Sequence, residues 1–433
     1  MAGAFGVISS EMSSSKLRCI EFFSGIGGWS RAIDLFSTST SSTIEVCRAY
    51  DVNPNANIVY EHNYPHMKVS TRSIVNLTAR EVDALEADIW VMSPPCQPFT
   101  RNNETDSRDC KDNRSDALIN LIHILQETQQ PPMYVALENV VGFETSDCCN
   151  LLLKALETVG YEYQQYQLTP TQFGIPNERP RYYLIASLMH KEAKSSQHVN
   201  FQNSLQSPYS GRKIRCSLWD NQEERATGLR VANYINDVIE PDLIIDDDTL
   251  SKKSSWCFDI VHPDHYRTSC FTKSYSRYSK GTGSVLLVDE ISHNDDSRNM
   301  VSDPRQAQIV CKRKQTAVNG DESNDDSSLL GELSKTPEER SFRTDWVNLL
   351  KNAKKSLRYF SSSELLSLFA FNEPTEHSAT TDALSKLDYA HKQSFEFPME
   401  ISRRKQYELL GNSVNVCVVG HLLMKLLQPS TDT

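Results

Sequence analysis

The sequence lacks any hydrophobic run that approaches a membrane span, and its first 16 residues lack the basic flank and apolar stretch of a signal peptide. These Ser-rich residues are expected to form a disordered lead-in. The 11 cysteines include no CxxC pair and no Cys/His grouping at zinc spacing. These absences predict reduced thiols, no metal, no membrane partner and a cytosolic or nuclear location.

Positive charge is also scarce, because 45 Lys and Arg residues are outnumbered by 56 Asp and Glu residues and the net charge is −11. This balance argues mildly against a nucleic-acid partner, which usually requires a basic surface. Much of the acid lies in short runs at 246–248, 295–296 and 321–326. Basic clusters lie at 267–280, 351–358 and 403–405. A local positive surface therefore stays open, although each cluster taken singly favours a solvated face.

Strand-like and helix-like segments alternate between residues 17 and 188. The alternation predicts an α/β fold with a mostly parallel central sheet and helices covering it. The expected strands are 17–23, 43–50, 88–92, 133–137, 161–168 and 182–187. The expected helices in this region are 28–36, 115–129 and 147–159.

The remaining chain divides into a smaller lobe and a return to regular structure. Residues 189–341 are rich in Ser, Asp and Asn with little periodicity, which predicts a small irregular lobe. Within it, 291–337 has too few apolar residues to fold and is predicted to be a disordered insertion. Residues 342–433 are expected to rejoin the part formed by 17–188, with helices at 361–371 and 413–427 and a polar surface loop at 373–394.

A cysteine follows the predicted strand 88–92. The strand stops at Pro94 and Pro95, which hold the chain extended without a free N–H, and the next residue is Cys96. Ligands of parallel α/β sheets bind beyond the carboxyl ends of the strands, which is where a nucleophile belongs. A cysteine in this position is by itself more often a small hydrophobic residue.

A glycine-rich turn follows the first predicted strand. Gly25, Gly27 and Gly28 let a ligand approach the backbone closely at a helix N-terminus, and Asp51 ends the next strand, where it could accept both ribose hydroxyls. The dinucleotide pattern GxGxxG would need glycine where Ser30 stands. An adenosine cofactor without a diphosphate, most commonly S-adenosylmethionine, fits better than NAD. Tight packing of the turn is an equally good explanation of the glycines alone.

Charged residues mark two further strand ends. Glu138 follows the apolar run of the strand predicted at 133–137, and Arg179 and Arg181 stand two residues apart before the strand 182–187. In extended chain, that spacing directs both guanidinium groups to one face. Each feature taken alone favours a solvated surface charge.

Five segments, taken in order, resemble the motifs of the cytosine-5 methyltransferases: FSGIGG, SPPCQPFTR, LENV, PNERPRYYLIA and LLGNSVNV. CFTK and GTGS narrow the resemblance to the branch called DNA methyltransferase 2, which methylates transfer RNA. The resemblance covers residues 17–188, 268–287 and 357–427. It implies a Rossmann-like S-adenosylmethionine-dependent methyltransferase domain and a target-recognition lobe.

The resemblance also implies roles for individual residues. Cys96 would attack carbon 6 of the cytosine, Glu138 would hold or protonate ring nitrogen 3, and Arg179 and Arg181 would support the thiolate. Substrate-binding residues are expected to be Gln97, Arg101, Cys270, Thr272 and Lys273. Cofactor-binding residues are expected to be Phe23, Ser24, Gly25, Gly27, Gly28, Asp51, Val52, Ser73, Ile74, Pro94, Asn412 and Ser413.

The implied function is transfer of a methyl group from S-adenosylmethionine to carbon 5 of a cytosine in a tRNA anticodon loop, with aspartate tRNA as the expected substrate and a monomeric enzyme. A DNA cytosine-5 methyltransferase and a non-catalytic RNA-binding protein of the same fold remain alternatives. The chain departs from the family pattern where Asn177 replaces a glutamine and where Ser73 and Ile74 replace an acid. Ser274 and Ser276 replace glycines, and residues 368–371 replace a Leu-Gly-Phe-Pro turn. None of these departures changes Cys96, Glu138 or Arg181.

Overall fold

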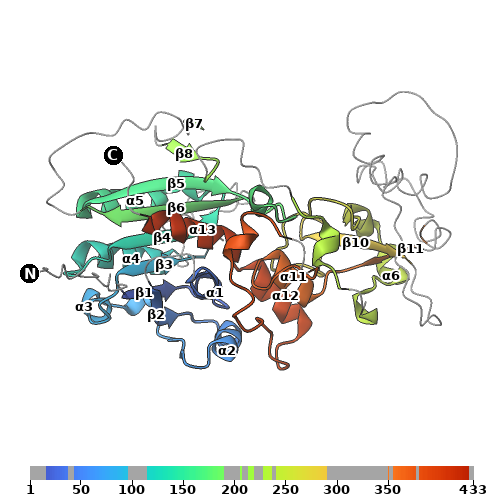
Figure 1. The fold of residues 1–433 in the computed structure, drawn as a ribbon, viewed down its shortest axis with the longest axis horizontal. Coiled ribbons are helices and arrows are strands. Elements are labelled where there is room, and N and C mark those ends of the chain that lie inside the picture. Colours follow the sequence, from blue (N-terminus) through green and yellow to red (C-terminus); the bar gives the residue numbers. More distant parts are fainter. Residues whose placement is uncertain are drawn as a thin grey trace, which may run out of the picture.

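The computed structural model describes residues 16–37, 43–95, 115–189, 205–206, 213–218, 228–236, 240–289, 350, 355–376 and 380–428. The predicted insertion at 291–337 lies outside these residues. So do residues 1–15 and Cys96, Gln97 and Arg101. Figure 1 shows two lobes side by side, a larger one built on a sheet and a smaller one around β10 and β11, with α11 and α12 between them.

The larger lobe contains an eight-stranded sheet in the order β2-β1-β3-β4-β6-β5-β8-β7. Strands β1 to β4 are parallel, and β6 is antiparallel to both β4 and β5. The predicted α/β fold with a mostly parallel sheet is therefore confirmed. The strands are β1 (Lys16–Phe22), β2 (Thr43–Tyr50), β3 (Ile89–Met92), β4 (Tyr134–Val140), β5 (Tyr161–Leu168), β6 (Arg181–Leu188), β7 (Leu205–Gln206) and β8 (Lys213–Arg215).

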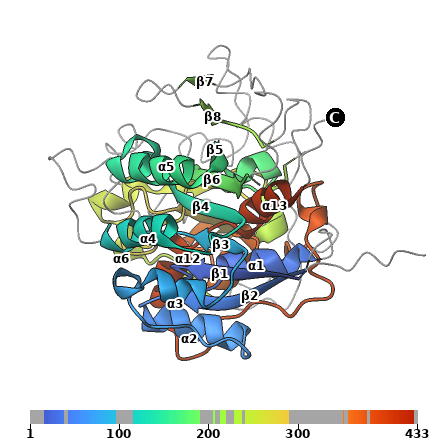
Figure 2. The ribbon, with the colours of Figure 1, turned by 90° about the vertical axis from the view of Figure 1, so that its left-hand side faces the viewer.

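Helices cover both faces of this sheet, as Figure 2 shows. Side chains alternate along each strand, so Val91 of β3 packs with α1 and α13 on one face, while Trp90 and Met92 pack with α4 and α5 on the other. All four residues of β3 are buried, which explains its continuous apolar run. The helices are α1 (Gly28–Leu35), α2 (Pro54–Asn63), α3 (Ala79–Asp83), α4 (Asp116–Glu127) and α5 (Asp147–Val159).

The smaller lobe has a three-stranded sheet of β9 (Asp259–Val261), β10 (Ser284–Asp289) and β11 (Lys355–Arg358). The predicted lobe boundary at residue 342 lies outside the described residues. The first described strand beyond it, β11, pairs antiparallel with β10 and so belongs to the smaller sheet. Short elements complete the lobe, namely the helix α6 (Asp247–Leu250) and the 3-10 turns η7 (Val231–Tyr234), η8 (Pro241–Leu243) and η9 (Lys253–Cys257).

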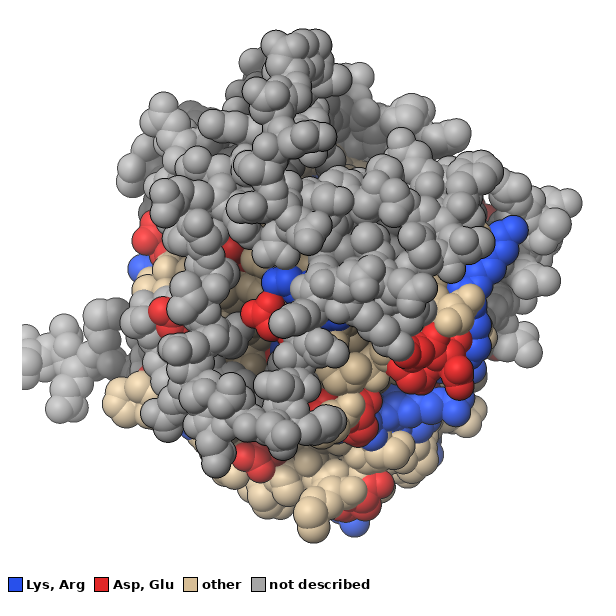
Figure 3. Space-filling model, turned by 90° about the vertical axis from the view of Figure 1, so that its right-hand side faces the viewer, with Lys and Arg blue, Asp and Glu red and all other residues tan. Residues whose placement is uncertain are grey.

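Two of the basic clusters do not form a free positive surface in the described part of the chain. Arg358 is 1% exposed and makes two parallel hydrogen bonds to Glu364, at 2.8 and 2.7 Å. Arg403 forms ion pairs with Glu240 and Asp242. Figure 3 shows the face at the end of the smaller lobe, where Lys and Arg lie beside Asp and Glu. Arg358 and Arg403 thus add less to a positive surface than the sequence suggests.

The C-terminal region contributes α11 (Ser362–Leu368), α12 (Arg403–Gly411) and α13 (Val416–Leu427). Helices were expected at 361–371 and 413–427, whereas α12 was not. The segment Arg403–Leu427 is long and apolar enough, by length and composition only, to cross a membrane, which corrects the expectation that no run approaches a span. In the structure the segment is two helices, and 67% of its most apolar window is buried inside the protein, as core helices are.

The expectation of a polar surface loop at 373–394 is wrong for its middle part. Thr381, Leu384 and Leu387 are 4%, 4% and 7% exposed. The Thr381 hydroxyl donates to the Phe173 carbonyl at 3.1 Å, and Leu384 begins a short 3-10 turn, η10 (Leu384–Lys386). The segment is buried because it packs on α13, where His421 lies 2.9 Å from the Ala383 carbonyl, and on the turn that follows β5. Polar composition alone does not reveal such packing.

Candidate active site

Two neighbouring groups of residues follow the carboxyl ends of the parallel strands. The cofactor edge comprises the turn after β1 and the residues after β2, namely 23–28 together with Asp51 and Val52. The catalytic edge comprises Ser93, Pro94 and Pro95 after β3, Glu138 in β4, and Arg179 and Arg181 at the start of β6. Because β1 pairs with both β2 and β3, and β3 pairs with β4, the two edges adjoin each other.

The turn of the cofactor edge depends on backbone shapes that favour glycine. Gly25 and Gly27 have φ values of 52° and 91°, and Phe23 adopts the left-handed region as well, at 55°. A Cβ on Gly28 would lie 2.5 Å from Val414 Cγ2 and 3.3 Å from Ser413 Oγ. The turn thus brings the start of α1 against the predicted cofactor-binding residues Asn412 and Ser413, which follow α12.

Asp51 fastens this turn. Its Oδ2 accepts from the Gly25 N–H at 2.8 Å and its Oδ1 accepts from the Asn53 N–H at 2.8 Å. Burial raises the pKa of Asp51, and these backbone donors oppose the rise. A carboxylate has about four lone-pair sites, so both oxygens keep capacity for ribose hydroxyls. The sequence predicted a ribose contact only, and the role in holding the turn is an additional finding.

The cofactor edge offers a polar and an apolar side chain that a nucleoside could contact. Ser24 is buried, and its Oγ has no hydrogen-bond partner within the described residues. Val52 is 66% exposed, so an apolar surface lies beside Asp51 where a ring could cover it. Ser73 caps a 3-10 turn, η2 (Ile74–Asn76), whose Ile74 is buried in the core beside β1 and β3. An unpaired buried hydroxyl and an uncovered apolar side chain are the features that a bound ligand would satisfy.

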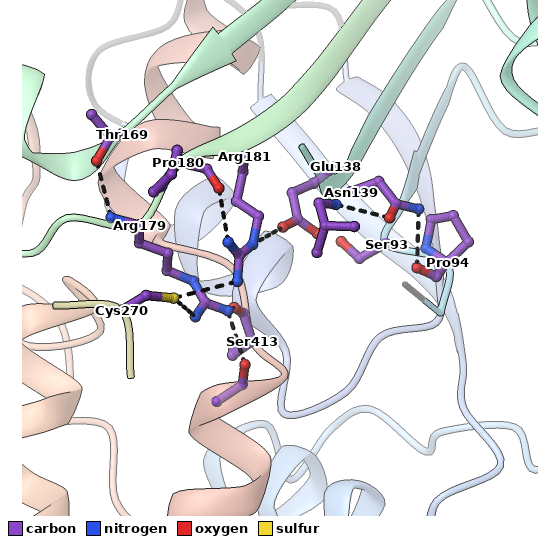
Figure 4. A network of polar contacts seen from close by, with 12 residues as sticks. Ser93, Pro94, Glu138, Asn139, Thr169, Arg179, Pro180, Arg181, Cys270 and Ser413 are labelled. Atoms are coloured by element: carbon purple, nitrogen blue, oxygen red, sulfur yellow. Dashed lines mark hydrogen bonds and ion pairs between the residues drawn. The ribbon is translucent and has the colours of Figure 1, made fainter. Parts of the chain in front are cut away.

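Glu138 is the central acid of the catalytic edge. It is 8% exposed, and its Oε1 lies 3.4 Å from Nε of Arg181 (Figure 4). Burial raises the pKa of Glu138, while Arg181, Arg179 and a hydrogen bond from the Ser93 side chain oppose the rise. Burial therefore shifts this carboxyl group toward its protonated form, against the pull of the two arginines.

Arg179 and Arg181 both approach the thiol of Cys270. Arg179 Nη1 lies 3.4 Å from Cys270 Sγ, and Arg181 Nη2 lies 3.8 Å from it. Burial would raise the pKa of Cys270, but the two guanidinium groups outweigh it and the pKa is lowered. The i, i+2 spacing thus directs both side chains to one place, as the sequence analysis expected.

Arg179 also joins three separate segments of the chain. Its guanidinium donates to the carbonyls of Phe271, Gly411 and Ser413 at 2.8, 3.0 and 2.7 Å. Its side chain is buried and lies 4.9 Å from the centre of the Phe369 ring. The structure therefore places Arg179 as a support of the site, with Arg181 as the arginine that contacts Glu138.

The predicted substrate residues of the smaller lobe meet the catalytic edge at the end of α12. A Cβ on Gly411 would lie 2.1 Å from the Lys273 backbone nitrogen, so the backbone of Thr272 and Lys273 packs directly on this glycine. The Lys273 side chain is exposed. This packing brings Cys270, Thr272 and Lys273 next to Arg179. Cys270 lies 91 residues after Arg179 in the sequence.

Cys96, Gln97 and Arg101 lie beyond the last described residue of their segment. The described part ends at Pro95, which is exposed, after the buried Pro94. The Asn139 side chain donates to the Pro94 carbonyl at 3.3 Å, which ties this exit to β4 (Figure 4). The strand that carries Cys96 therefore ends beside Glu138, and the roles of the three residues stay predictions.

Two polar features were not predicted from the sequence, namely the hydrogen bonds to the buried Glu21 and the contact between Trp29 and Ser93. Glu21 of β1 is fully buried and accepts from the Trp29 N–H at 3.3 Å, from Ser30 Oγ and from Tyr60 OH. Burial raises the pKa of Glu21 to about 7. The Trp29 indole donates to Ser93 Oγ at 2.9 Å. An acid within the apolar run of β1 was a visible signal for the first contact, whereas nothing in the sequence pointed to the second.

The catalytic edge offers the Glu138 carboxyl group and the guanidinium groups of Arg179 and Arg181, next to the segment that leads into Cys96. The cofactor edge offers side chains that could bind an adenosine ligand. Within the described residues, no three His, Cys, Asp or Glu side chains group together in a way that could hold a metal ion. The chemistry available from the described groups is proton transfer at Glu138 and stabilisation of developing negative charge by the two guanidinium groups.

Comparison with known proteins agrees with this arrangement. A human protein named tRNA (cytosine(38)-C(5))-methyltransferase is 31% identical over 457 aligned residues, which cover 95% of this chain and 99% of the human protein. A Dictyostelium discoideum protein named DNA (cytosine-5)-methyltransferase is 27% identical and covers 96% of both chains. A crystal structure of mutant DNMT2 from Spodoptera frugiperda has a TM-score of 0.64 at 27% identity, covering 95% of this chain and all of that one.

The family model of the C-5 cytosine-specific DNA methylases matches residues 17–428, which is almost the whole chain. The match includes both edges of the sheet and the smaller lobe. It confirms the family that the five sequence motifs predicted. The chain belongs to the C-5 cytosine-specific DNA methylase family.

Proposed function

We propose that this C-5 cytosine methyltransferase transfers its methyl group to a cytosine in a tRNA anticodon loop, with aspartate tRNA as the first candidate. The observation that carries the proposal is the buried Glu138–Arg181 pair beside the exit of β3, the strand that leads into Cys96. The printed name of the human relative supports tRNA as the substrate class.

Cys96 has the first chemical role in this proposal. Carbon 5 of cytosine is too weak a nucleophile to take a methyl group directly, so the Cys96 thiolate adds to carbon 6. The addition leaves an electron-rich carbon 5 and places negative charge toward ring nitrogen 3. A free thiol has a pKa of about 8.5, so nearby positive charge is needed to raise its thiolate fraction. Arg181, which lies 3.4 Å from Glu138, is the first candidate to supply this charge, and Arg179 is the second.

Glu138 meets the charge that develops on the ring. Its carboxyl group donates or shares a proton with nitrogen 3 as the thiolate adds, and takes it back when the thiolate leaves. Burial favours the protonated form of Glu138, which suits the donating step. After the methyl group has moved to carbon 5, loss of the carbon 5 proton to a base expels Cys96 and restores the aromatic ring, so Cys96 and Glu138 are regenerated while the methyl donor is used up.

S-adenosylmethionine, the cofactor general to this family, supplies the electrophilic methyl group when bound. The turn at 23–28 would hold its methionine part together with Asn412 and Ser413, and Asp51 would hold its ribose. The exposed Val52 and the half-buried Phe23 would cover its adenine.

DNA is the alternative substrate, because the Dictyostelium relative bears a DNA methyltransferase name. The target base must leave its stack in either nucleic acid to reach a buried acid. Unstacking requires less energy in a single-stranded RNA loop than in a duplex, which favours tRNA. A cytosolic or nuclear location and a monomeric state complete the proposal.

The deciding experiment measures transfer of labelled methyl from S-adenosylmethionine to total tRNA and, separately, to duplex DNA. Labelling of tRNA at a single cytosine is expected. Labelling of DNA alone would replace the proposed substrate. Tight tRNA binding without transfer to either polymer would favour the non-catalytic RNA-binding alternative.

A further inference from the structure

The basic cluster at 267–280 keeps most of its charge free, unlike the described arginines of the other two clusters. The sequence contains no Asp or Glu between residues 267 and 289. Arg267 forms an ion pair with Glu178. The other cations of the cluster are exposed and pair with no acid among the residues that the structure describes, namely Lys273, Arg277 and Lys280. Their charge is therefore available to phosphate groups.

The target loop, residues 272–282, carries these cations on a fixed backbone. The Thr272 N–H donates to the Thr282 carbonyl at 2.9 Å, which closes the loop. Thr282 Oγ1 donates to the Tyr278 carbonyl at 2.6 Å. Tyr275 anchors the loop in the core, because it is 2% exposed and its hydroxyl donates to the Ser284 carbonyl at 2.8 Å. A loop held in this way loses little freedom when a ligand binds.

Tyr278 is presented to solvent by this loop. It is 60% exposed, whereas Tyr275, three residues earlier, is buried. The guanidinium carbon of Arg277 lies 5.6 Å from the centre of the Tyr278 ring, and most of the ring stays open. A single exposed aromatic residue is ordinary on a protein surface. An exposed ring among unpaired cations, however, is the combination that stacks a base and binds the phosphates beside it.

The target loop begins at the catalytic edge. The backbone of Thr272 and Lys273 packs on Gly411, whose carbonyl accepts from Arg179 Nη2 at 3.0 Å. Figure 4 shows Cys270, two residues before the loop, in contact with Arg179. The loop thus adjoins the place where the target cytosine must bind, so the nucleotides that flank this cytosine are the ones that the loop can contact.

We propose that Tyr278 stacks an unpaired base that neighbours the target cytosine, while Arg277 and Lys280, together with Lys273, bind the adjoining phosphates. The inference rests on the proposed function, because it takes the substrate to be a single-stranded loop of tRNA. Bases in such a loop can leave their stack and cover an aromatic ring, whereas bases in a duplex cover one another. Every base has a π-face, so Tyr278 selects unpaired structure and not a particular base.

A binding measurement that needs no turnover tests the stacking. The full-length protein is titrated into an anticodon stem-loop RNA with a fluorescent adenine analogue on one side of the target cytosine, and then into one with the analogue on the other side. On one side, the bound RNA should fluoresce less with the natural protein than with Tyr278→Ala, because stacking quenches the analogue. Tyr278→Phe keeps the ring and should keep the quenching. Equal fluorescence with the natural protein and with Tyr278→Ala on both sides would overturn the proposal.

Affinity measures the size of each contact. Tyr278→Ala should raise Kd for the stem-loop about tenfold, which is the scale of one lost base stack, and should leave Kd for duplex RNA unchanged. Thermal stability should not fall, since the ring is exposed. Arg277→Gln and Lys280→Gln should each weaken binding less and reduce the salt dependence, with the slope of log affinity against log salt smaller by about 0.7. An unaltered slope in both variants would refute the phosphate contacts.

Tyr266→Ala provides the matched control. Tyr266 is 51% exposed on the same lobe and also lies beside an arginine, but its hydroxyl accepts from Arg230 Nε at 3.0 Å and Arg230 is paired with Asp264. Its loss should change neither affinity nor fluorescence. Equal losses in the two tyrosine variants would overturn the specific role of Tyr278.

Methyl transfer separates this inference from the proposed function. Transfer to tRNA with the same KM in the natural protein and in Tyr278→Ala would refute the stacking role and leave the proposed function standing. Absence of transfer to tRNA by the natural protein, with stem-loop quenching that still depends on Tyr278, would refute the proposed function and support the stacking role.

Discussion

The cofactor edge and the catalytic edge each hold a buried carboxyl group, but by different means. Asp51 is held by backbone N–H groups of Gly25 and Asn53, whereas Glu138 is paired with the side chain of Arg181. Backbone donors come with the fold, and no substitution at their own positions removes them, except to proline. Side-chain donors can each be replaced. The backbone therefore fixes the position of Asp51 in the cofactor edge. The position of Glu138 in the catalytic edge depends on a side chain that a single substitution can remove.

The sharpest way to break the catalytic edge alone is Cys96→Ala. It should abolish methyl transfer and leave S-adenosylmethionine binding largely intact, because the thiol attacks the base and not the cofactor. Transfer of labelled methyl and calorimetric cofactor binding measure the two effects. With RNA carrying fluorine at carbon 5 of the target cytosine, a covalent adduct should accumulate on Cys96. An adduct mapped by mass spectrometry to another cysteine would contradict the assignment.

Glu138→Gln should lower kcat by about a hundredfold or more, since a positioned acid contributes on this scale. Binding of RNA should change much less, because the bond to the ring strengthens only as charge develops. Burial raises the pKa of Glu138, so activity that needs its proton should fall as pH rises through that pKa. Equal losses in RNA affinity and in rate would point to a binding role instead.

Asp51→Ala tests the cofactor edge in the same way. It should raise KM for S-adenosylmethionine about tenfold or more, because a ribose contact is lost together with the bond that holds Gly25 of the turn. The kcat at saturating cofactor should change less than in Glu138→Gln. Asp51→Asn, which keeps one acceptor oxygen, is the matched control with a smaller expected effect. An unchanged KM in Asp51→Ala would remove the ribose assignment.

The buried Glu21 of β1 should make the free energy of unfolding depend on pH. Its pKa is raised from 4.5 to about 7, so the folded protein binds more protons than the unfolded chain between these values. Stability is therefore lost as pH rises through this window, by ~3 kcal/mol at most. Glu21→Gln should remove this loss, and denaturant unfolding at pH 5 and pH 8 measures it. The same pH dependence in both proteins would refute the burial argument.

The smallest effect is expected from removing residues 295–333 and inserting a short Gly/Ser linker. If this acidic part of the insertion is a solvated spacer, thermal stability and methyl transfer should both stay nearly unchanged. Loss of phosphate repulsion should modestly tighten RNA binding at low salt. A large fall in tRNA methylation at normal thermal stability would mean that the segment contacts the substrate.

Local patterns predicted the larger lobe well, because its elements carry their own signals. β5 and α5 have the predicted bounds, since α5 begins at the Ser146 cap and ends at Gly160 in the left-handed region. The two arginines converge because extended chain alternates its side chains. The family motifs pointed to residues at both edges, since four of the five lie at strand ends and the fifth, LLGNSVNV, joins α12 to α13.

Long-range pairing explains what the sequence could not reveal. Arg358 was counted with a basic cluster, but its partner Glu364 becomes evident only when β11 and α11 are placed together. Thr381 and Leu384 lie in a polar stretch whose burial depends on α13 and on the turn after β5. The contact between Trp29 and Ser93 spans 64 residues and depends on the register between β1 and β3. No local pattern encodes such pairs.

The long-range hydrogen bonds of Arg179 have a consequence for folding during synthesis. Its guanidinium finds its carbonyl partners at Phe271, Gly411 and Ser413, which are synthesised 92 or more residues later, the last of them 234 residues later. When the strands of the large sheet have left the ribosome, the carbonyl groups that accept from the buried Arg179 guanidinium have not yet been synthesised. Since contacts of such long sequence separation form slowly, the last step of folding should be the docking of residues 411–413. The nascent chain therefore completes its active site only when its C-terminal helices emerge.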